Sequence, residues 1–403
     1  MKTDISYARL AALMLLSLIV TACQAWPWGP NRGAPGQASL PSGKTTTTGF
    51  DCPEPNPRMP VASTQLDLLV WSEYIPLEFF ECFELVYGIP VAHPEYDSVE
   101  EMYDLITAGD AAYDLIQPTD FVIPRMVREG LLRELDHARL PSLANFNPHY
   151  LNLAFDPHNA YTIPYEAGLD AIVVNTAAVD IVPESWADLW NASYLGRLLL
   201  TDDERTVIGL TLLTLGFDVN STSPSELDQA RRALMVLRPG IAVFDSESPS
   251  SRLVAGEVDL GVTWSGEAFL AHQQDPAIEF VYPSEGPILW QDTWAMPSTA
   301  AHEDAAYAWL NYTMQGDMFW MMLTNFPYTN PNDAALAYAK GNPMAVTDVN
   351  GEATTLGAVY EAYMNSTITN PPAEVIRSGH RIVDVGDAVA LYDEIWEEVA
   401  GGE

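Results

Sequence analysis

The sequence is poor in basic side chains. Its 403 residues include 18 lysines and arginines against 55 aspartates and glutamates, which gives a formal net charge of −37 at pH 7. A surface this acidic argues against binding to nucleic acid or to anionic lipid headgroups, whereas it permits a cationic ligand. Most of these carboxylates are expected to be solvated, so the residues of a binding site have to be argued one by one.

Long apolar runs are missing after the first 22 residues. There, Lys2 and Arg9 precede an apolar stretch over residues 10–20, which is short for a transmembrane helix and predicts an export signal over residues 1–22. The tetrad that ends at Cys23 resembles a bacterial lipobox, whose cysteine becomes acylated. We therefore expect an extracytoplasmic chain, in the periplasm or at the cell surface, that is anchored to the membrane through Cys23. An ordinary secretory signal is the alternative, and it also implies export.

Cysteine and histidine are scarce as well. Besides Cys23 the chain has only Cys52 and Cys82, which in an exported protein can form a disulfide or stay free. The seven histidines form no HExxH motif or close cluster, and there is no GxSxG motif or phosphate loop. We therefore expect no metal, no cofactor and no catalytic residue.

Residues 23–60 are rich in Pro, Gly, Ser and Thr and short of aliphatic side chains, which predicts a flexible tether. The remaining body, residues 61–403, is longer than one hydrophobic core usually fills, so we expect two lobes. Apolar runs of strand length, such as residues 66–71 and 171–175, alternate with segments of helical spacing, such as residues 76–87. This alternation predicts an α/β fold with helices flanking a parallel sheet.

Aromatic and acidic side chains recur directly after the predicted strands. Ligands of open α/β sheets bind at the carboxyl ends of strands, so these positions are candidates for a site. The segments concerned are residues 71–74, 118–121, 201–204, 264–267 and 290–292. Their chemistry suits an organic ammonium ion, because aromatic faces attract cations and carboxylates form charge-assisted hydrogen bonds with them.

Several segments resemble the polyamine-binding proteins of ABC transporters. They occur in the order and at the spacing of that family: VWSEYIP (70–76), AYDLIQPTDF (112–121), IPYEAGLDAIVVN (163–175), SWADLW (185–190), LLLTDD (198–203), GEVDLGVTWSGEAF (256–269) and ILWQDTWAMP (288–297). The resemblance covers nearly everything after the tether. It implies a receptor that captures a polyamine such as putrescine or spermidine and delivers it to transporter permease subunits.

The fold implied by the resemblance is the type II periplasmic-binding-protein fold, in which two α/β lobes are joined by crossing strands and hold the ligand in the cleft between them. We expect one lobe to comprise residues 61–170 and 293–335, and the other to comprise residues 171–292 and 336–403. Hinge closure around the ligand is then the working motion.

The resemblance also implies the ligand-binding residues. The family's aromatic positions correspond to Trp71, Tyr74, Phe121, Trp264, Trp290 and Tyr328. Its carboxylates correspond to Asp203 and Asp292, and its hydroxyl groups to Ser72 and Thr119. Each cation over a ring face contributes about 0.5 to 2 kcal/mol, and the carboxylates are expected to set the positions of the ammonium groups.

Three positions depart from the spermidine-binding members of the family. A carboxylate is replaced by Thr206, a glutamine by Ile382, and a phenol by Phe121. Glu267, three residues after Trp264, matches an acid of putrescine-type members, which suggests a carboxylate that has moved. The preferred polyamine therefore stays open, as do the affinity and the oligomeric state.

Two other functions are compatible with parts of this pattern. A sugar-binding protein of the same fold would explain the tryptophans, but it would leave several carboxylates unneutralised. A glycoside hydrolase would combine paired carboxylates with tryptophans. We expect binding without catalysis, because a binding protein needs no nucleophile and the chain shows none of the motifs above.

Overall fold

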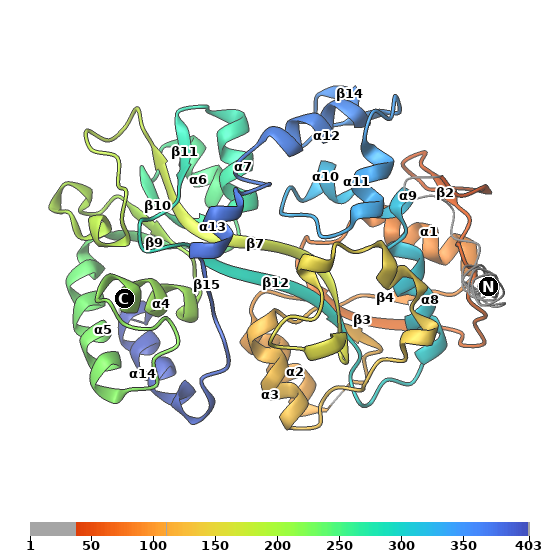
Figure 1. Cartoon of the computed structure of the whole chain (residues 1–403), viewed down its shortest axis with the longest axis horizontal. Coiled ribbons are helices and arrows are strands. Elements are labelled where there is room, and N and C mark those ends of the chain that lie inside the picture. Colours follow the sequence, from red (N-terminus) through yellow and green to blue (C-terminus); the bar gives the residue numbers. More distant parts are fainter. Residues whose placement is uncertain (1–37, 110, 402–403) are drawn as a thin grey trace, which may run out of the picture. The chain divides into compact units, whose positions relative to one another are not determined.

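The computed structural model describes residues 38–109 and 111–401 (Figure 1). The predicted export signal, Cys23 and the first part of the predicted tether lie outside these residues. Within the described ranges, every helix is too short or too polar to cross a bilayer.

An 11-stranded mixed sheet runs through the described part of the chain, with the order β4-β3-β6-β12-β7-β10-β8-β9. The strands β5, β11 and β15 lie off this path and pair with β3, β7 and β12, respectively. Its strands are β3 (Leu66–Trp71), β4 (Val91–Ala92), β5 (Glu95–Tyr96), β6 (Leu115–Ile116), β7 (Thr162–Asn175), β8 (Leu198–Leu200), β9 (Ile241–Phe244), β10 (Leu260–Trp264), β11 (Ile278–Val281), β12 (Ile288–Ala295) and β15 (His380–Arg381).

Strands β7 and β12 connect two lobes of this sheet (Figure 1). The first nine residues of β7 pair antiparallel with β12, which also pairs with β6. The last residues of β7 pair with β10 and β11. Because one continuous strand belongs to both lobes, the backbone of the connection is hydrogen-bonded along its length, and the α/β class predicted from the sequence is observed.

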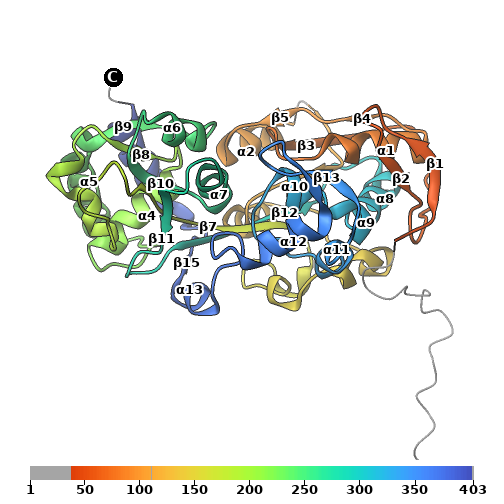
Figure 2. The same cartoon turned by 90° about the horizontal axis from the view of Figure 1, so that it is seen from above.

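The first lobe packs its helices around β3, β6 and the adjoining ends of β7 and β12 (Figure 2). Its core is aromatic, since Phe79 and Phe83 of the first helix contact the same cluster as Trp294, Trp309 and Phe319. The elements are α1 (Leu77–Tyr87), α2 (Val99–Ala108), η1 (Asp120–Val122), α3 (Ile123–Arg128), η4 (Pro148–Tyr150), α8 (Glu303–Thr313), α9 (Gly316–Phe319), α10 (Met322–Asn325), α11 (Asp333–Ala339), β13 (Ala345–Thr347), β14 (Ala353–Thr355) and α12 (Leu356–Asn365).

The second lobe packs helices on both sides of β8, β9 and β10. Trp186, Tyr194 and Tyr392 are fully buried in it, and Ile382, which replaces the expected glutamine, lies in the same apolar cluster. The elements are η6 (Trp186–Trp190), α4 (Glu204–Thr214), α5 (Pro224–Leu237), α6 (Pro249–Ala255), α7 (Ser265–Gln274), α13 (Ala373–Ser378) and α14 (Val389–Ala400).

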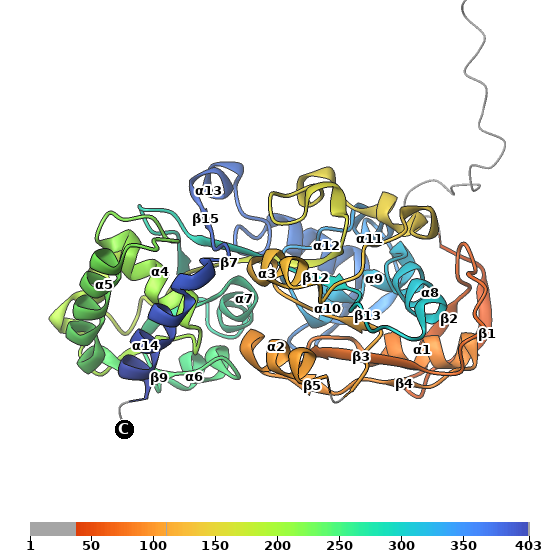
Figure 3. The same cartoon turned by 90° about the horizontal axis from the view of Figure 1, so that it is seen from below.

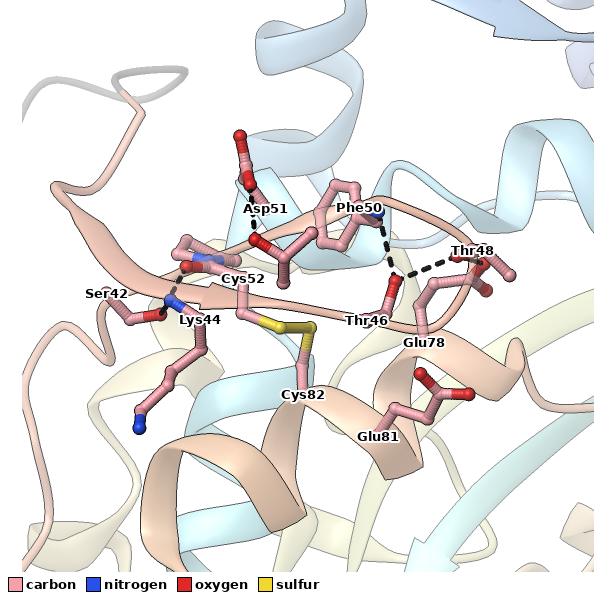
Figure 4. The surroundings of a disulfide bond; sticks show 12 residues. Ser42, Lys44, Thr46, Thr48, Phe50, Asp51, Cys52, Glu78, Glu81 and Cys82 are labelled. Atoms are coloured by element: carbon pink, nitrogen blue, oxygen red, sulfur yellow. Dashed lines mark hydrogen bonds between the residues drawn. A yellow bond between two sulfur atoms is a disulfide. The ribbon is translucent and has the colours of Figure 1, made fainter.

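Part of the predicted tether is folded. Residues 41–53 form an antiparallel hairpin of β1 (Pro41–Thr45) and β2 (Asp51–Pro53), and Cys52 forms a disulfide with Cys82 of α1 (Figure 4). The Phe50 ring packs at a tilt against Trp320, with ring centroids 6.3 Å apart. The composition of this segment suggested a tether because it cannot bury much surface alone, but the disulfide and Phe50 fasten it to the core of the first lobe.

Helix α12 packs on the first lobe, although the sequence assigned residues 336–403 to the second. Leu356, Val359 and Tyr363 lie in the same apolar cluster as Leu66 and Trp309. The reason is the amphipathic face of α12, which covers α11 and α10, whereas the later segment from β15 onward belongs to the second lobe. The remaining lobe boundaries stay a prediction.

Candidate functional site

One face of strands β10, β7 and β12 collects the side chains of the candidate site. Trp264 lies directly opposite Asp170, and Trp290 lies opposite Gly168. Directly opposed residues of antiparallel strands carry their side chains on the same face of a sheet, and so do residues two apart along one strand. The two predicted tryptophans therefore share a face with the carboxylate of Asp170.

The indole of Trp290 rests on the backbone of β7. A Cβ atom at Gly168 would lie 2.2 Å from the nearest ring atom, so only glycine leaves room for the ring there. The indole Nε1 donates a hydrogen bond to Oδ1 of Asp170 at 3.2 Å. Ring and carboxylate are thereby held next to each other, as a site for a hydrophobic cation requires.

Tyrosine rings continue this surface into the first lobe. The ring centroid of Tyr328 lies 5.2 Å from that of Trp290 and 5.7 Å from that of Tyr74. Tyr74 in turn contacts Tyr165 and Phe326 edge to face. The buried hydroxyl of Tyr74 lies close enough to Asp292 to lower the pKa of that carboxyl, against the larger opposite effect of burial, so it is a polar group within the site.

Tyr328 also touches the second lobe. A Cβ atom at Gly266, in the first turn of α7, would lie 2.4 Å from the Tyr328 ring. Because Tyr328 packs with the core of the first lobe and α7 with that of the second, this contact brings the two lobes together at the candidate site.

Asp292 is the carboxylate at the first-lobe end of the site. Its side chain is 7% exposed, and Oδ1 accepts a hydrogen bond from Oγ1 of Thr119 at 2.6 Å. Burial raises the pKa of Asp292 to about 7, an effect that the bond from Thr119 reduces and the nearby Asp120 increases. The structure thus joins two predicted site residues, Thr119 of the segment between β6 and η1 and Asp292 of β12.

A second acidic group surrounds the start of α4. Asp203 is the N-cap of that helix, and its Oδ1 accepts from the backbone N–H groups of Arg205 and Thr206 at 2.9 and 3.0 Å. Oγ1 of Thr206 donates to Oδ2 of Asp170 at 2.7 Å and lies 3.2 Å from Oδ2 of Asp203. Thr206, at the position where the resemblance implies an acid, therefore connects Asp170 and Asp203 by hydrogen bonds.

Glu267 lies in the first turn of α7, beside the Tyr328 contact. Its Oε2 accepts from the backbone N–H of Ser250 at 3.1 Å. Burial raises the pKa of Glu267 above its ordinary value, and the hydrogen bond from Ser250 offsets part of that rise. Glu267 also raises the pKa of Tyr328, so the two side chains share one electrostatic environment.

Three predicted residues take positions at the margin. The Trp71 ring lies 4.5 Å from that of Tyr96, and its Nε1 is buried without a partner. Ser72 donates a hydrogen bond to Asp97 at 2.5 Å. Phe121 lines a cavity of about 360 Å³ whose other lining residues include members of α2, α3, α4 and α14. Figure 3 shows these four helices.

Two acidic residues of β7 join the site although the sequence did not assign them to it. Asp170 is 1% exposed and Glu166 is 0% exposed. Burial raises the pKa of both groups, with the neighbouring Asp203 adding to the effect at Asp170 and Asp292 at Glu166. Their signal in the sequence was two charges, four residues apart, in an otherwise apolar strand, which places both on one face of the sheet.

The site has carboxylates and lacks counter-ions. Among the described residues, no ion pair joins a lysine or arginine to any of the five acids of the site, which are Glu166, Asp170, Asp203, Glu267 and Asp292. By contrast, the adjacent Asp120 is paired with Arg381 at 2.6 Å. Glu166, Asp170 and Asp292 are buried, and buried carboxylates without a cationic partner are costly, so this arrangement favours a cationic ligand.

Asp67, Asp114 and His302 form a separate cluster whose ligand atoms lie within 4.8 Å of one another. Asp114 already accepts hydrogen bonds from the backbone of Asp67, Ala301 and His302, and its Oδ2 lies 2.9 Å from Nδ1 of His302. The cluster thus fixes the segment before α8 to β3, at a distance in the fold from the candidate site.

Two α/β lobes that share connecting strands, with aromatic rings and uncompensated acids where the lobes meet, define the class of two-lobed solute-binding proteins. The sequence matches the family model of the bacterial extracellular solute-binding proteins over residues 80–348. The chain belongs to this family.

Characterised relatives cover most of the chain. It is 37% identical over 336 residues to the spermidine/putrescine-binding periplasmic protein of Escherichia coli K12. The alignment covers 82% of this chain and 90% of that protein. It is 34% identical to spermidine/putrescine-binding periplasmic protein 1 of Haemophilus influenzae, over 84% of this chain and 89% of the relative.

Solved structures with the same fold include a putative spermidine/putrescine ABC transporter protein from Listeria monocytogenes, with a TM-score of 0.75, 26% identity and coverage of 84% of this chain and 99% of that one. The spermidine/putrescine substrate-binding protein of Streptococcus pneumoniae gives a TM-score of 0.67 at 29% identity, over 84% and 99% of the two chains. The predicted two-lobed binding-protein fold is confirmed.

Proposed function

We propose that this chain is the extracytoplasmic substrate-binding protein of an ABC transporter and that it captures a polyamine such as putrescine or spermidine for import. The observation that carries the proposal is the group of five carboxylates without basic partners beside Trp290, Tyr328 and Trp264. The relatives named for spermidine and putrescine binding support the same ligand class. Closing the lobes around a cation would neutralise acids that burial otherwise destabilises.

In this proposal the acids divide by position. Asp292 holds one ammonium group at the first-lobe end, while Asp170 and Asp203 hold another where β7 meets α4. Trp290 lies between the two groups, because its indole is bonded to Asp170 and its strand also carries Asp292. The rings of Trp264, Trp290 and Tyr328 line the methylene chain. Trp71, Ser72, Tyr74, Thr119, Phe121 and Glu267 complete the proposed set.

The proposed receptor acts by binding alone, without a cofactor, and its closed form is recognised by permease subunits. Export and lipidation at Cys23 would hold it at the membrane where those subunits lie. Metabolic labelling with a radioactive or alkyne fatty acid tests the anchor: we expect labelled protein in the membrane fraction, and a Cys23→Ser variant without label. Equal labelling of the two proteins would contradict lipidation at this residue.

The ligand class is tested by isothermal titration of the purified chain with putrescine, spermidine, spermine and maltose at low and high salt. We expect saturable binding of at least one amine, weaker at high salt because exposed charge attraction is screened, and no heat from maltose. Binding of maltose in place of every amine would replace the proposal with a sugar receptor. Release of a chromophore from a nitrophenyl glycoside would contradict binding without catalysis.

A further inference from the structure

Glu166 is a buried acid for which the fold supplies no partner. The side chain is fully buried, and neither carboxylate oxygen accepts a hydrogen bond. Other buried acids differ in this respect, since Asp156 accepts four hydrogen bonds from Tyr161 and Thr162. An unpaired buried carboxyl is costly and indicates a missing partner.

A β-bulge brings Glu166 opposite Asp292. Gln291 pairs with Ala167 and Thr293 pairs with Pro164, so Asp292 alone on β12 lies opposite both Tyr165 and Glu166 on β7. Bulges of this kind redirect side chains and occur next to functional sites. Glu166 is thereby placed beside Asp292, the carboxylate that binds an ammonium group in the proposed function.

The other groups around Glu166 are neutral phenols. Burial raises the pKa of five tyrosines, and Glu166 adds to the rise in each: these residues are Tyr74, Tyr150, Tyr165, Tyr328 and Tyr363. The guanidinium group of Arg381 forms an ion pair with Asp120, with 2.6 Å between Nη1 and Oδ2. Asp292 is therefore the group that titrates together with Glu166, while the phenols keep their protons near neutral pH.

We propose that Glu166 is a ligand-binding residue that, together with Asp292, holds one ammonium group of the polyamine and exchanges a proton for it. The inference rests on the proposed function, since it names a further residue of the same site. Burial favours the neutral carboxylic acid of Glu166 while the site holds no ligand. When the ammonium group enters, the O–H proton leaves to solvent, and the carboxylate forms a charge-assisted hydrogen bond with the ammonium group.

This exchange links binding to pH. Burial and the charge of Asp292 hold the pKa of Glu166 well above its ordinary value in the free protein, and a bound cation lowers it. Amine affinity consequently rises with pH until the pKa of the free protein is passed. Ligand binding therefore releases a proton at pH values between the pKa of Glu166 in the complex and its pKa in the free protein.

The test is titration calorimetry of the full chain with its amine at pH 7 in phosphate and in Tris, whose ionisation enthalpies differ, so that the difference in heat counts the protons released. Glu166→Gln keeps the shape of the side chain and removes the acid. We expect this variant to release about one proton fewer per bound amine and to bind at least about tenfold more weakly at pH 8. Comparison with the same ligand cancels the proton exchange of the amine itself.

Asp317→Asn is the matched control, because Asp317 is also a buried acid with a raised pKa but lies in α9, bonded to the backbone of Ser39 at 2.5 Å. It should keep the proton release and affinity of the unmodified chain. If the unmodified chain binds no amine, the proposed function fails. If it binds amines and Glu166→Gln matches it in both readouts, only the present inference is overturned.

A measurement on the unmodified chain keeps the inference testable if the variant does not fold. Its affinity for the amine should rise from pH 5.5 to pH 7.5. A flat profile over that range would overturn the proton exchange at Glu166.

Discussion

At the residue scale, two glycines determine where the rings of the site lie. Gly168 gives Trp290 its place on β7, and Gly266 gives Tyr328 its place on α7. Neither contact can form with a larger residue unless the ring moves, because real Cβ atoms do not approach other atoms to 2.2 or 2.4 Å. The second glycine matters most for function, since its contact joins the two lobes.

Gly266→Ala should therefore separate folding from closure. We expect the Tyr328 contact to be lost when the lobes open without ligand, and alanine, which is favoured over glycine by about 1 kcal/mol in a helix interior and by less in a first turn, should then leave the melting temperature of the ligand-free protein the same or slightly higher. The added methyl group meets the Tyr328 ring and should weaken amine binding at least about tenfold by opposing closure. Calorimetry and thermal melting measure the two effects, and unchanged affinity would show that the contact does not limit binding.

The sequence predicted Asp203, Asp292, Trp264 and Trp290 through their positions after strands and through the family resemblance. It could not predict what each carboxylate touches. Two acids, Asp202 and Asp203, stand before α4; Asp202 is exposed, while Asp203, the predicted ligand residue, is also the N-cap of the helix. Adjacent acids before a helix look alike in sequence, and only the backbone of the turn decides which one bonds to the helix N–H groups.

At the scale of elements, β7 shows why strand length was underestimated. The sequence indicated residues 171–175, yet the strand runs from Thr162 to Asn175. Glu166, Gly168 and Asp170 interrupt the apolar pattern that marks a buried strand. Glu166 and Asp170 belong to the candidate site, so its polar residues concealed the strand that carries them.

The disulfide is the second element-scale feature. It joins two cysteines with a sequence separation of 30 and fastens β2 to α1 (Figure 4). The double variant Cys52→Ser, Cys82→Ser should lose about 3 to 4 kcal/mol of unfolding free energy, as expected from loop closure in the unfolded chain.

Denaturant unfolding of the oxidised and variant proteins measures that loss. Amine affinity of the folded variant should equal that of the unmodified chain. A variant of equal stability would contradict a structural role, and one with weakened binding would show that the hairpin supports the site.

At the scale of the whole molecule, the buried acids make ligand-free stability depend on pH. Burial raises the pKa of Asp120 to about 6, of Asp292 to about 7 and of Glu204 to about 8. A group whose pKa is raised by folding stabilises the protein fully below its unfolded pKa, and this stabilisation is lost as pH rises through the folded pKa. Asp304, whose pKa is lowered from 3.8 to about 2, contributes stability that is present above its unfolded pKa, so its contribution is nearly equal at pH 5 and pH 8.

The ligand-free chain should therefore melt at a lower temperature at pH 8 than at pH 5, in buffers of equal ionic strength. A saturating polyamine should raise the melting temperature more at pH 8, because it neutralises acids that are charged there. Differential scanning calorimetry at the two pH values measures both effects. A higher melting temperature at pH 8 without ligand would contradict the burial of these acids.

The central claim is that uncompensated carboxylates on the face of β7 and β12 hold the ammonium groups of a polyamine. The most direct measurement is the dissociation constant of spermidine for the unmodified chain, for Asp292→Asn and for Asp317→Asn, by titration calorimetry at low salt. We predict that Asp292→Asn weakens binding at least about tenfold and that Asp317→Asn leaves it unchanged, because only the first removes a charge at the site. Equal affinities in all three proteins would contradict the claim.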